Sequence, residues 1–168
     1  MTSATSRPAG LKVQVGDQMP SVGLRASDGF LLNLRSFVGK RPSIVVFLGG
    51  PTLKGAARQR GDELAGMLKD AHPRIERAGV GLVCVTTDSE EQQAAYIAKQ
   101  ELPYLLFSDE RRSACAALGI PIRDDRGNMN AEPTAFAVAQ DGTILDIVER
   151  AGPKGLIARL LEAINPPD

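Results

Sequence analysis

Two cysteines, Cys84 and Cys115, carry the most reactive side chains of this 168-residue sequence. A thiolate is a nucleophile and a redox group, but only where its surroundings lower the thiol pKa and leave the sulfur accessible. Cys84 lies in an apolar, β-branched run at 80–85, and a cysteine buried in such a strand packs as a small hydrophobic group. Cys115 lies in the middle of a predicted short helix, where we expect it to be half exposed. A helix-filling role is favoured for Cys115, with a resolving or sensor thiol as the alternative.

The number and spacing of the metal-binding and redox residues exclude several kinds of site. Two cysteines are too few for the disulfide framework of a small secreted protein and too far apart for a CxxC redox pair. The single histidine, His72, leaves no histidine cluster for zinc or haem. Asp124 and Asp125 could hold a cation, but no ligand series of the EF-hand type follows them. We therefore expect neither a metal nor a cofactor.

A basic cluster follows the first predicted buried strand. Lys54, Arg58 and Arg60, together with Thr52, lie where the next helix is expected to begin. A helix N-terminus with cationic neighbours binds anions readily, so a carboxylate, phosphate or sulfate ligand is one interpretation. A solvated loop and first helical turn is favoured over it, since Lys and Arg are mostly exposed in any case.

The charge balance and the hydropathy pattern exclude further function classes. Twenty Lys and Arg residues balance twenty Asp and Glu residues, for a formal net charge of +0, whereas nucleic-acid and membrane-surface proteins present a basic face. We therefore expect no nucleic-acid and no membrane partner, and no apolar run approaches the ~18 residues of a membrane span. Residues 1–10 are rich in Ser, Thr and Ala, which predicts a flexible leader rather than a signal peptide. Residues 11–168 then form a single domain, with a cytoplasmic location expected.

Alternating strands and helices must position these residues. The runs at 44–48 and 80–85 predict two buried strands, and residues 58–77 carry apolar side chains at helical spacing between them. A helical crossover of this kind makes the two strands parallel. A second helix is predicted over 90–100, with N-cap side chains just before it. We expect its apolar face to consist of Ala94, Ala95, Ile97 and Ala98.

Turn residues predict the rest of the architecture. An Asp-Gly turn at 141–142 and another at 28–29 indicate hairpins near the two ends of the domain. Between them we expect an extended piece kept from a central position by Pro103, a short helix ended by Gly119, and a polar loop at 123–128. A last amphipathic helix is predicted over 153–164. The pattern favours an α/β thioredoxin-like sandwich: a mixed central sheet with helices on both faces and an N-terminal β-hairpin extension.

Short motifs in this order resemble the redoxin, or peroxiredoxin-like, branch of the thioredoxin fold, the alkyl hydroperoxide reductase/thiol-specific antioxidant family. The resemblance runs from about residue 11 to 164. The motifs are GD-x-x-P at 16–20, a DG turn at 28–29, GK-x-P at 39–42, a strand and loop at 85–89, LPY with SD at 102–109, ALGI at 117–120, and P-T-x-F with DG at 133–142. The resemblance implies an oxidoreductase or antioxidant role, and a commonly cis proline at Pro133.

The sequence departs from the family pattern at the reactive thiol. Active members carry a cysteine at the helix N-terminus after the first buried strand, with a nearby Thr and Arg to position the peroxide. Counting from Phe47 places that position near Leu53, and counting back from Gly79 places it near Arg58; neither count reaches a cysteine or a serine. The resemblance therefore implies a redoxin scaffold without the family nucleophile.

Two interpretations of function remain. In the first, the scaffold is a binding module whose cleft takes a small anionic ligand or a protein partner, with a homodimer expected from the pairing of other redoxins. In the second, it is an atypical enzyme that uses Cys115, or a cofactor-free activity built from the Lys, Arg and Thr side chains of the cleft. The residues expected to line this cleft are Thr52, Lys54, Arg58, Arg60, Arg123, Pro133 and Thr134.

Overall fold

Seven strands form one mixed sheet in the computed structural model of this protein, which describes residues 10–125 and 127–167. Their order is β2-β1-β5-β4-β3-β8-β9, in which β3, β4 and β5 run parallel and the other pairs are antiparallel. Residues 1–9 of the predicted leader lie outside the described residues. The strands are β1 (Gly23–Ala26), β2 (Leu31–Asn33), β3 (Ser43–Phe47), β4 (Gly81–Thr86), β5 (Leu106–Ser108), β8 (Thr134–Val138) and β9 (Ile144–Glu149).

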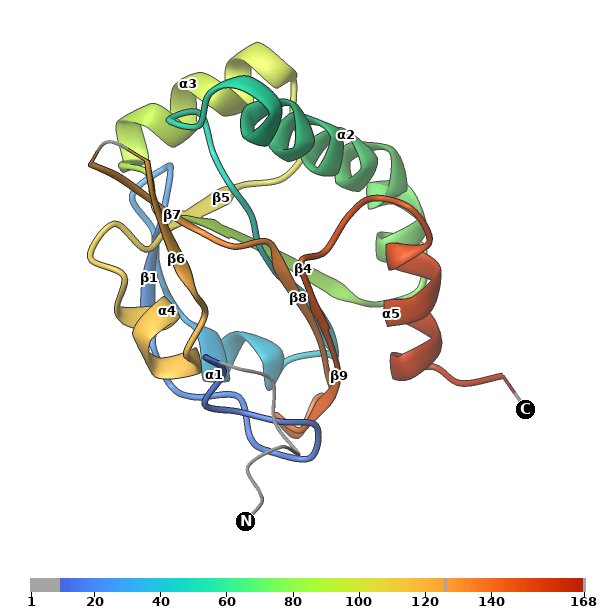
Figure 1. Ribbon diagram of the computed structural model, residues 1–168. Coiled ribbons are helices and arrows are strands. Elements are labelled where there is room, and N and C mark those ends of the chain that lie inside the picture. The colour runs from blue at the N-terminus through green and yellow to red at the C-terminus, as the bar shows by residue number, and fades with distance from the viewer. Residues whose placement is uncertain (1–9, 126, 168) are drawn as a thin grey trace.

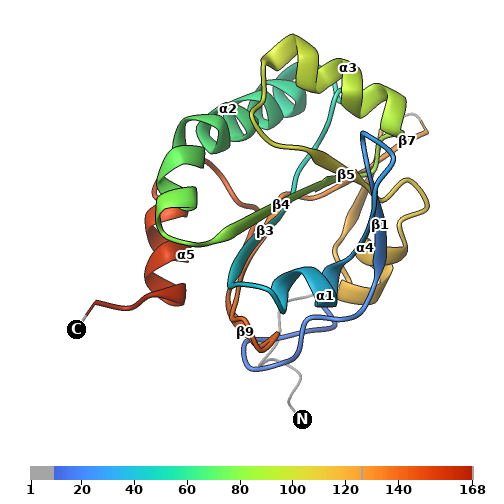
Figure 2. The same ribbon diagram turned by 180° about the vertical axis from the view of Figure 1, so that it is seen from behind.

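Helices cover both faces of this sheet (Figures 1 and 2). α2, α3 and α5 pack on one face, and α1 and α4 pack on the other. With the antiparallel β1–β2 hairpin at the N-terminal end, this confirms the predicted thioredoxin-like sandwich. No helix in the described part of the chain is long and apolar enough to span a bilayer. The helices are α1 (Leu34–Val38), α2 (Gly55–Arg77), α3 (Glu90–Gln100), α4 (Ser113–Leu118) and α5 (Leu156–Ile164).

Strand β3 separates two hydrophobic cores, and all five of its residues are buried. Val45 and Phe47 belong to the core under α1 and α4, while Ile44 and Val46 belong to the core under α2 and α5. The alternation follows from the two-residue period of a strand, and burial on both faces explains the continuous apolar run in the sequence. Parallel pairing of β3 with β4 confirms the predicted helical crossover.

Local signals fix the ends of the helices as expected. Ser89 accepts a hydrogen bond from the backbone N–H of Gln92, whose side chain accepts one from the Ser89 N–H, so a complete capping box begins α3. Gly119 ends α4 in the left-handed region at φ 74°. A Cβ at this position would lie 2.1 Å from the carbonyl oxygen of Gly10, so only glycine fits.

The buried face of α3 differs from the prediction. Gln93 and Tyr96 are buried there, because their polar ends find partners: the Gln93 amide donates to the Thr86 hydroxyl, and the Tyr96 hydroxyl donates to a carboxylate oxygen of Asp62 at 2.5 Å. The Tyr96 ring buries more apolar area than an alanine does, while the Oε1 atom of Gln93 has no hydrogen-bond partner among the described residues. Of the four residues expected on this face, the alanines are exposed and the isoleucine is half-buried: Ala94, Ala95, Ala98 and Ile97.

Three further elements correct the sequence-based expectations. β5 lies inside the sheet between β1 and β4, because Pro103 precedes the strand and removes none of its backbone donors. Most of the polar loop expected at 123–128 belongs instead to the strands of a separate two-stranded ribbon, β6 (Ile122–Asp125) with β7 (Asn128–Ala131), in which Asp124 accepts a hydrogen bond from the Gly127 N–H. Helix α1, which the sequence did not indicate, is capped by the side chain of Asn33.

Candidate functional site

Both cysteines lie inside the hydrophobic cores. Cys84 is 0% exposed in β4 and Cys115 is 1% exposed in α4, so the expectation of a half-exposed Cys115 is wrong. In α4 the side chains of Ala114, Cys115 and Leu118 face the sheet, and carboxylate oxygens of Asp109 accept hydrogen bonds from the Ala114 and Cys115 N–H groups. A short alanine-rich helix gives no clear apolar stripe, so its sequence does not show which side faces inward.

The surroundings of both sulfurs favour the neutral thiol. Burial raises the pKa of Cys84 well above its ordinary value. Burial also raises the pKa of Cys115, and the neighbouring Asp109 carboxylate raises it further by its charge and its hydrogen bond. Neither sulfur has the exposed, electropositive setting that activates a thiol.

The start of α2 lies between the two positions counted from the sequence. The helix begins at Gly55, with Lys54 as an N-cap that makes no side-chain hydrogen bond. Its first turn consists of Gly55, Ala56 and Ala57, followed by Arg58. The first three residues of this helix therefore carry small side chains, with no sulfur and no hydroxyl among them.

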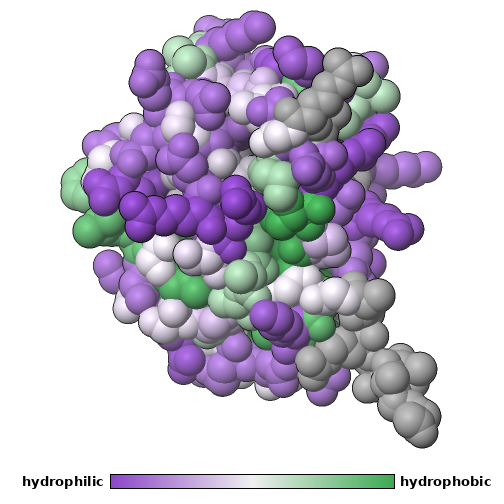
Figure 3. Space-filling view, turned by 60° about the vertical axis from the view of Figure 1, so that its left-hand side comes forward, coloured by the Kyte–Doolittle hydropathy of each residue, from purple (hydrophilic) through white to green (hydrophobic). Residues whose placement is uncertain are grey.

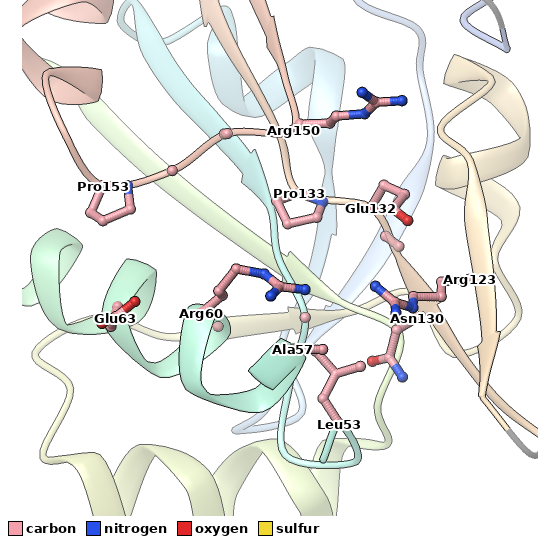
Figure 4. A pocket seen from close by; sticks show the side chains of 15 residues that line it. Leu53, Ala57, Arg60, Glu63, Arg123, Asn130, Glu132, Pro133, Arg150 and Pro153 are labelled. Carbon is pink, nitrogen blue, oxygen red and sulfur yellow. The ribbon is translucent and has the colours of Figure 1, made fainter. Parts of the chain in front are cut away.

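A pocket of about 340 Å³ opens beside this helix start (Figure 4). It lies past the carboxyl end of β3, where the neighbours of that strand are parallel β4 on one side and antiparallel β8 on the other. Crevices outside the carboxyl ends of strands are the usual ligand sites of open α/β sheets. The lining residues are Gly49, Leu53, Ala57, Arg60, Gly61, Glu63, Arg123, Asn130, Ala131, Glu132, Pro133, Arg150, Ala151, Gly152 and Pro153.

Three arginines from separate elements reach this pocket. Arg60 comes from α2, Arg123 from β6 and Arg150 from the segment after β9. Figure 4 shows the Arg60 and Arg123 side chains extending toward each other from opposite sides of the pocket. Within the described part of the chain, none of these three guanidinium groups makes an ion pair or a side-chain hydrogen bond. Their charge is therefore available to a ligand.

The structure distributes the residues predicted for the cleft over several places. Arg60, Arg123 and Pro133 line the pocket, and the peptide bond before Pro133 is trans, like all others of the described residues. Lys54 is exposed and lines neither this pocket nor the one beside it. Thr134 is buried in β8, and its hydroxyl donates to the carbonyl oxygen of Glu132 at 2.9 Å.

Thr52 and Arg58 lie in a second, more open pocket beside α3. The Arg58 guanidinium donates to Asp62 at 3.0 Å and to the carbonyl oxygen of Pro51 at 2.9 Å, and it lies 5.4 Å from the ring centroid of Tyr96. These contacts use its charge within the fold. Arg58 therefore holds the loop before α2 rather than facing the larger pocket.

A polar network of partly and fully buried side chains holds the loop before α2 in place. The Thr52 hydroxyl donates to Asp88 at 2.8 Å and accepts from the side-chain amide of Asn130 at 3.2 Å. Asp88 is 3% exposed, and its Oδ2 atom has no hydrogen-bond partner among the described residues. A Cβ on Gly50 would lie 1.7 Å from that oxygen, so only glycine leaves room for the carboxylate.

Several lining residues have no signal in the sequence. Arg150 reaches the pocket because the β8–β9 register pairs Thr134 with Glu149, and the Ala151 N–H donates to the carbonyl oxygen of Pro133 at 2.9 Å. Asn130 reaches it through the unexpected β6–β7 ribbon. Both positions depend on pairing between distant segments, and no local periodicity reports such pairing.

Known proteins share this architecture. Peroxidoxin BcpB from Mycobacterium tuberculosis superposes with a TM-score of 0.75 at 19% identity, covering 89% of this chain and 94% of the other. Xanthomonas campestris peroxiredoxin Q superposes with a TM-score of 0.70 at 20% identity, covering 92% and 96%. These similarities establish the fold.

Similarity in sequence establishes the family. Chloroplastic peroxiredoxin Q from Populus jackii is 31% identical over 110 residues, which cover 66% of this chain and 49% of the relative, so the chain matches about half the length of that relative. A putative peroxiredoxin bcp from Coxiella burnetii is 23% identical over 154 residues, covering 90% and 98%. The AhpC/TSA family model matches residues 15–147. The chain belongs to the AhpC/TSA family.

Proposed function

We propose that this protein is a peroxiredoxin-fold binding module that takes a small anionic ligand in the pocket beside α2 and does not reduce peroxides through a thiol. One observation carries the proposal: beside the helix start where the family resemblance implies a reactive cysteine, the pocket presents the guanidinium groups of Arg60, Arg123 and Arg150, which have no ion-pair or hydrogen-bond partner among the described residues. Guanidinium groups bind carboxylates and phosphates through paired hydrogen bonds. The burial of both sulfurs supports the second part of the proposal, the absence of thiol chemistry, because a peroxide cannot reach a sulfur in the core.

The alternative is an enzyme that keeps the oxidoreductase role of its family. It would use Cys115, or a cofactor-free combination of Lys54, Arg58, Arg60 and Thr134. Burial at Cys115 disfavours the first route, because a peroxide would have to enter the core to reach the sulfur. Placement of Arg60 and Arg58 in different pockets disfavours the second route.

The face of the molecule drawn in Figure 3 bears on whether the ligand is small or a protein. Hydrophobic side chains on this face form separate patches among hydrophilic ones, which favours a small ligand over a broad protein interface there. Protein interfaces centre on larger continuous apolar patches. A homodimer and a cytoplasmic location stay predictions.

Peroxide consumption tests the absence of thiol chemistry. Wild-type protein and Cys115→Ser receive hydrogen peroxide or an alkyl hydroperoxide with dithiothreitol, and the remaining peroxide is followed. We expect no consumption above the dithiothreitol background in either protein. Turnover that Cys115→Ser abolishes, or that is lost only when Cys84→Ser is added, would overturn the proposal, and turnover that survives in the double variant would establish a thiol-independent enzyme instead.

Anion binding tests the role of the pocket. Acetate and inorganic phosphate are titrated into wild-type protein in low-chloride buffer, with calorimetry and thermal stability as readouts. Arg60→Ala should weaken binding about tenfold or more, since a charge-assisted hydrogen bond contributes about 1.5–3 kcal/mol. Lys54→Ala is the matched control, because it removes one positive charge nearby without touching the pocket. Equal binding by all three proteins would contradict the proposal.

A further inference from the structure

We infer that the pocket selects a monocarboxylate with an aliphatic chain, in preference to phosphate or a polyanion. This inference rests on the function proposed above and names the class of ligand. It is drawn from three properties of the pocket: the balance of charges in its lining, the positions of its arginines, and its apolar walls.

The lining carries opposing charges. Arg60, Arg123 and Arg150 are accompanied by Glu63 and Glu132, which leaves one net positive charge in the pocket at neutral pH. A single negative charge on the ligand is matched by this balance. A second negative charge would enter a lining in which two carboxylates oppose three guanidinium groups, and repulsion between like charges offsets part of the added attraction to the arginines.

Two of the arginines are placed to hold one carboxylate. The Arg60 and Arg123 side chains extend toward each other across the pocket (Figure 4). A guanidinium is planar and presents its N–H groups as a fork that matches the two oxygens of a carboxylate. An anionic head between Arg60 and Arg123 also lies near the Asn130 side chain, which lines the same region.

The remaining walls are apolar and fit a short hydrocarbon chain. They are formed by alanine, proline and leucine side chains from the loop before α2 and its first turn, from the end of β7 and the segment that follows it, and from the segment after β9. The volume of about 340 Å³ is near the small end of the roughly 300–1,000 Å³ range of small-molecule sites. These wall residues are Leu53, Ala57, Ala131, Pro133, Ala151 and Pro153.

Calorimetric titration with a chain-length series tests the inference. The probes are acetate, butyrate, hexanoate and octanoate, with inorganic phosphate, succinate and hexanol for comparison. We expect affinity to rise about fourfold for each added methylene until the pocket is filled, from the transfer free energy of a CH₂ group. Phosphate, succinate and hexanol should all bind more weakly than hexanoate.

Two variants separate the causes. Glu132→Gln should improve succinate binding relative to hexanoate, because it removes one repelling carboxylate from the pocket. Arg123→Lys keeps the charge but removes the planar fork, and should weaken all carboxylates severalfold while leaving the gain per methylene unchanged. Both residues are partly or fully exposed, and the unfolding transition without ligand verifies that each variant is folded.

Three outcomes would overturn the inference. Hexanol binding as tightly as hexanoate would show that the carboxylate is not recognised. Equal affinities for acetate, butyrate, hexanoate and octanoate would show that the aliphatic chain of the ligand is not recognised. Phosphate binding more tightly than hexanoate, and being lost in Arg60→Ala, would overturn the inference while leaving the proposed function intact. If no anion binds at all, the proposed function itself fails.

Discussion

The cysteine sites and the arginine pocket differ in what they offer to solvent. The sulfurs of Cys84 and Cys115 lie in the two cores with 0% and 1% exposure, while Arg60, Arg123 and Arg150 are exposed around an open cavity. The fold therefore buries both thiols and leaves the three arginine side chains of the pocket exposed to solvent.

A cysteine introduced at the pocket should give the largest effect, because it places a thiol in the exposed region instead of in a core. Ala57→Cys would place a thiol in the first turn of α2, on the pocket lining and near Arg60, where the helix N-terminus lowers a thiol pKa. In native protein at neutral pH we expect its alkylation by iodoacetamide to be about a thousandfold or more faster than that of Cys84 and Cys115, which react only on unfolding.

Ala94→Cys is the control for that experiment, because residue 94 is exposed in the middle of α3. Its thiol should alkylate at an ordinary rate and with an ordinary pH profile. If the Ala57→Cys profile matches that of Ala94→Cys, the pocket does not activate a thiol. Rapid alkylation of native Cys115 would remove the contrast between the two regions altogether.

Gly50→Ala tests the network that holds the pocket loop. The new Cβ would displace the buried Asp88 carboxylate, and we expect a loss of about 2–4 kcal/mol in the free energy of unfolding by urea. Gly66→Ala is the matched control: it lies inside α2 with no atom within 4 Å of the added Cβ, so it should stabilise the protein by about 0.5–1 kcal/mol. Equal effects of the two substitutions would show that the Gly50–Asp88 contact is unimportant.

Alkaline pH should destabilise the protein through its thiols. Burial raises the folded-state pKa of Cys84 and Cys115 above the unfolded value, so their contribution is complete below about pH 8.5. As the pH rises above that value, the unfolded state releases protons that the folded state retains, and each group costs up to about 1.4 kcal/mol per pH unit. Unfolding of wild-type protein and Cys84→Ala between pH 7 and 10 should show a smaller loss in the variant. Parallel curves would contradict burial of this thiol as the cause.

Arg150→Gly should have the smallest effect on stability and should separate stability from binding. Arg150 lies in the left-handed region at φ 51°, which is unfavourable for a residue with a Cβ. Glycine there should raise the unfolding free energy by up to about 1 kcal/mol while weakening hexanoate binding severalfold. Glu101→Gly, at φ 54° and away from the pocket, should give the same gain without affecting binding. A loss of stability in Arg150→Gly would indicate that its side chain holds the fold.

Local signals in the sequence predicted most of the fold but little of the pocket. The capping box at Ser89 and the Asp-Gly turn at 141–142 gave the bounds of α3 and the β8–β9 hairpin, because these interactions involve neighbouring residues. Arg60 was in the predicted cleft, since it follows the helix start. Arg150 was not, because its place depends on the register of two strands. The burial of Cys115 cannot be predicted from its helix, because tertiary packing decides which side of α4 is buried.

The β6–β7 ribbon gives the pocket one wall that is mechanically distinct from the others. It forms its own two-stranded sheet, tied to the body by contacts such as the 2.5 Å hydrogen bond from the Thr87 hydroxyl to the Met129 carbonyl oxygen. A two-stranded hairpin has little stability of its own, whereas Arg60 is carried by a long helix packed on the main sheet. Arg123 therefore lies on a wall of the pocket outside the main sheet, and because Ile122 and Ala131 anchor the ribbon in the core under α1 and α4, a change in the width of the anion site requires the ribbon to move against these contacts.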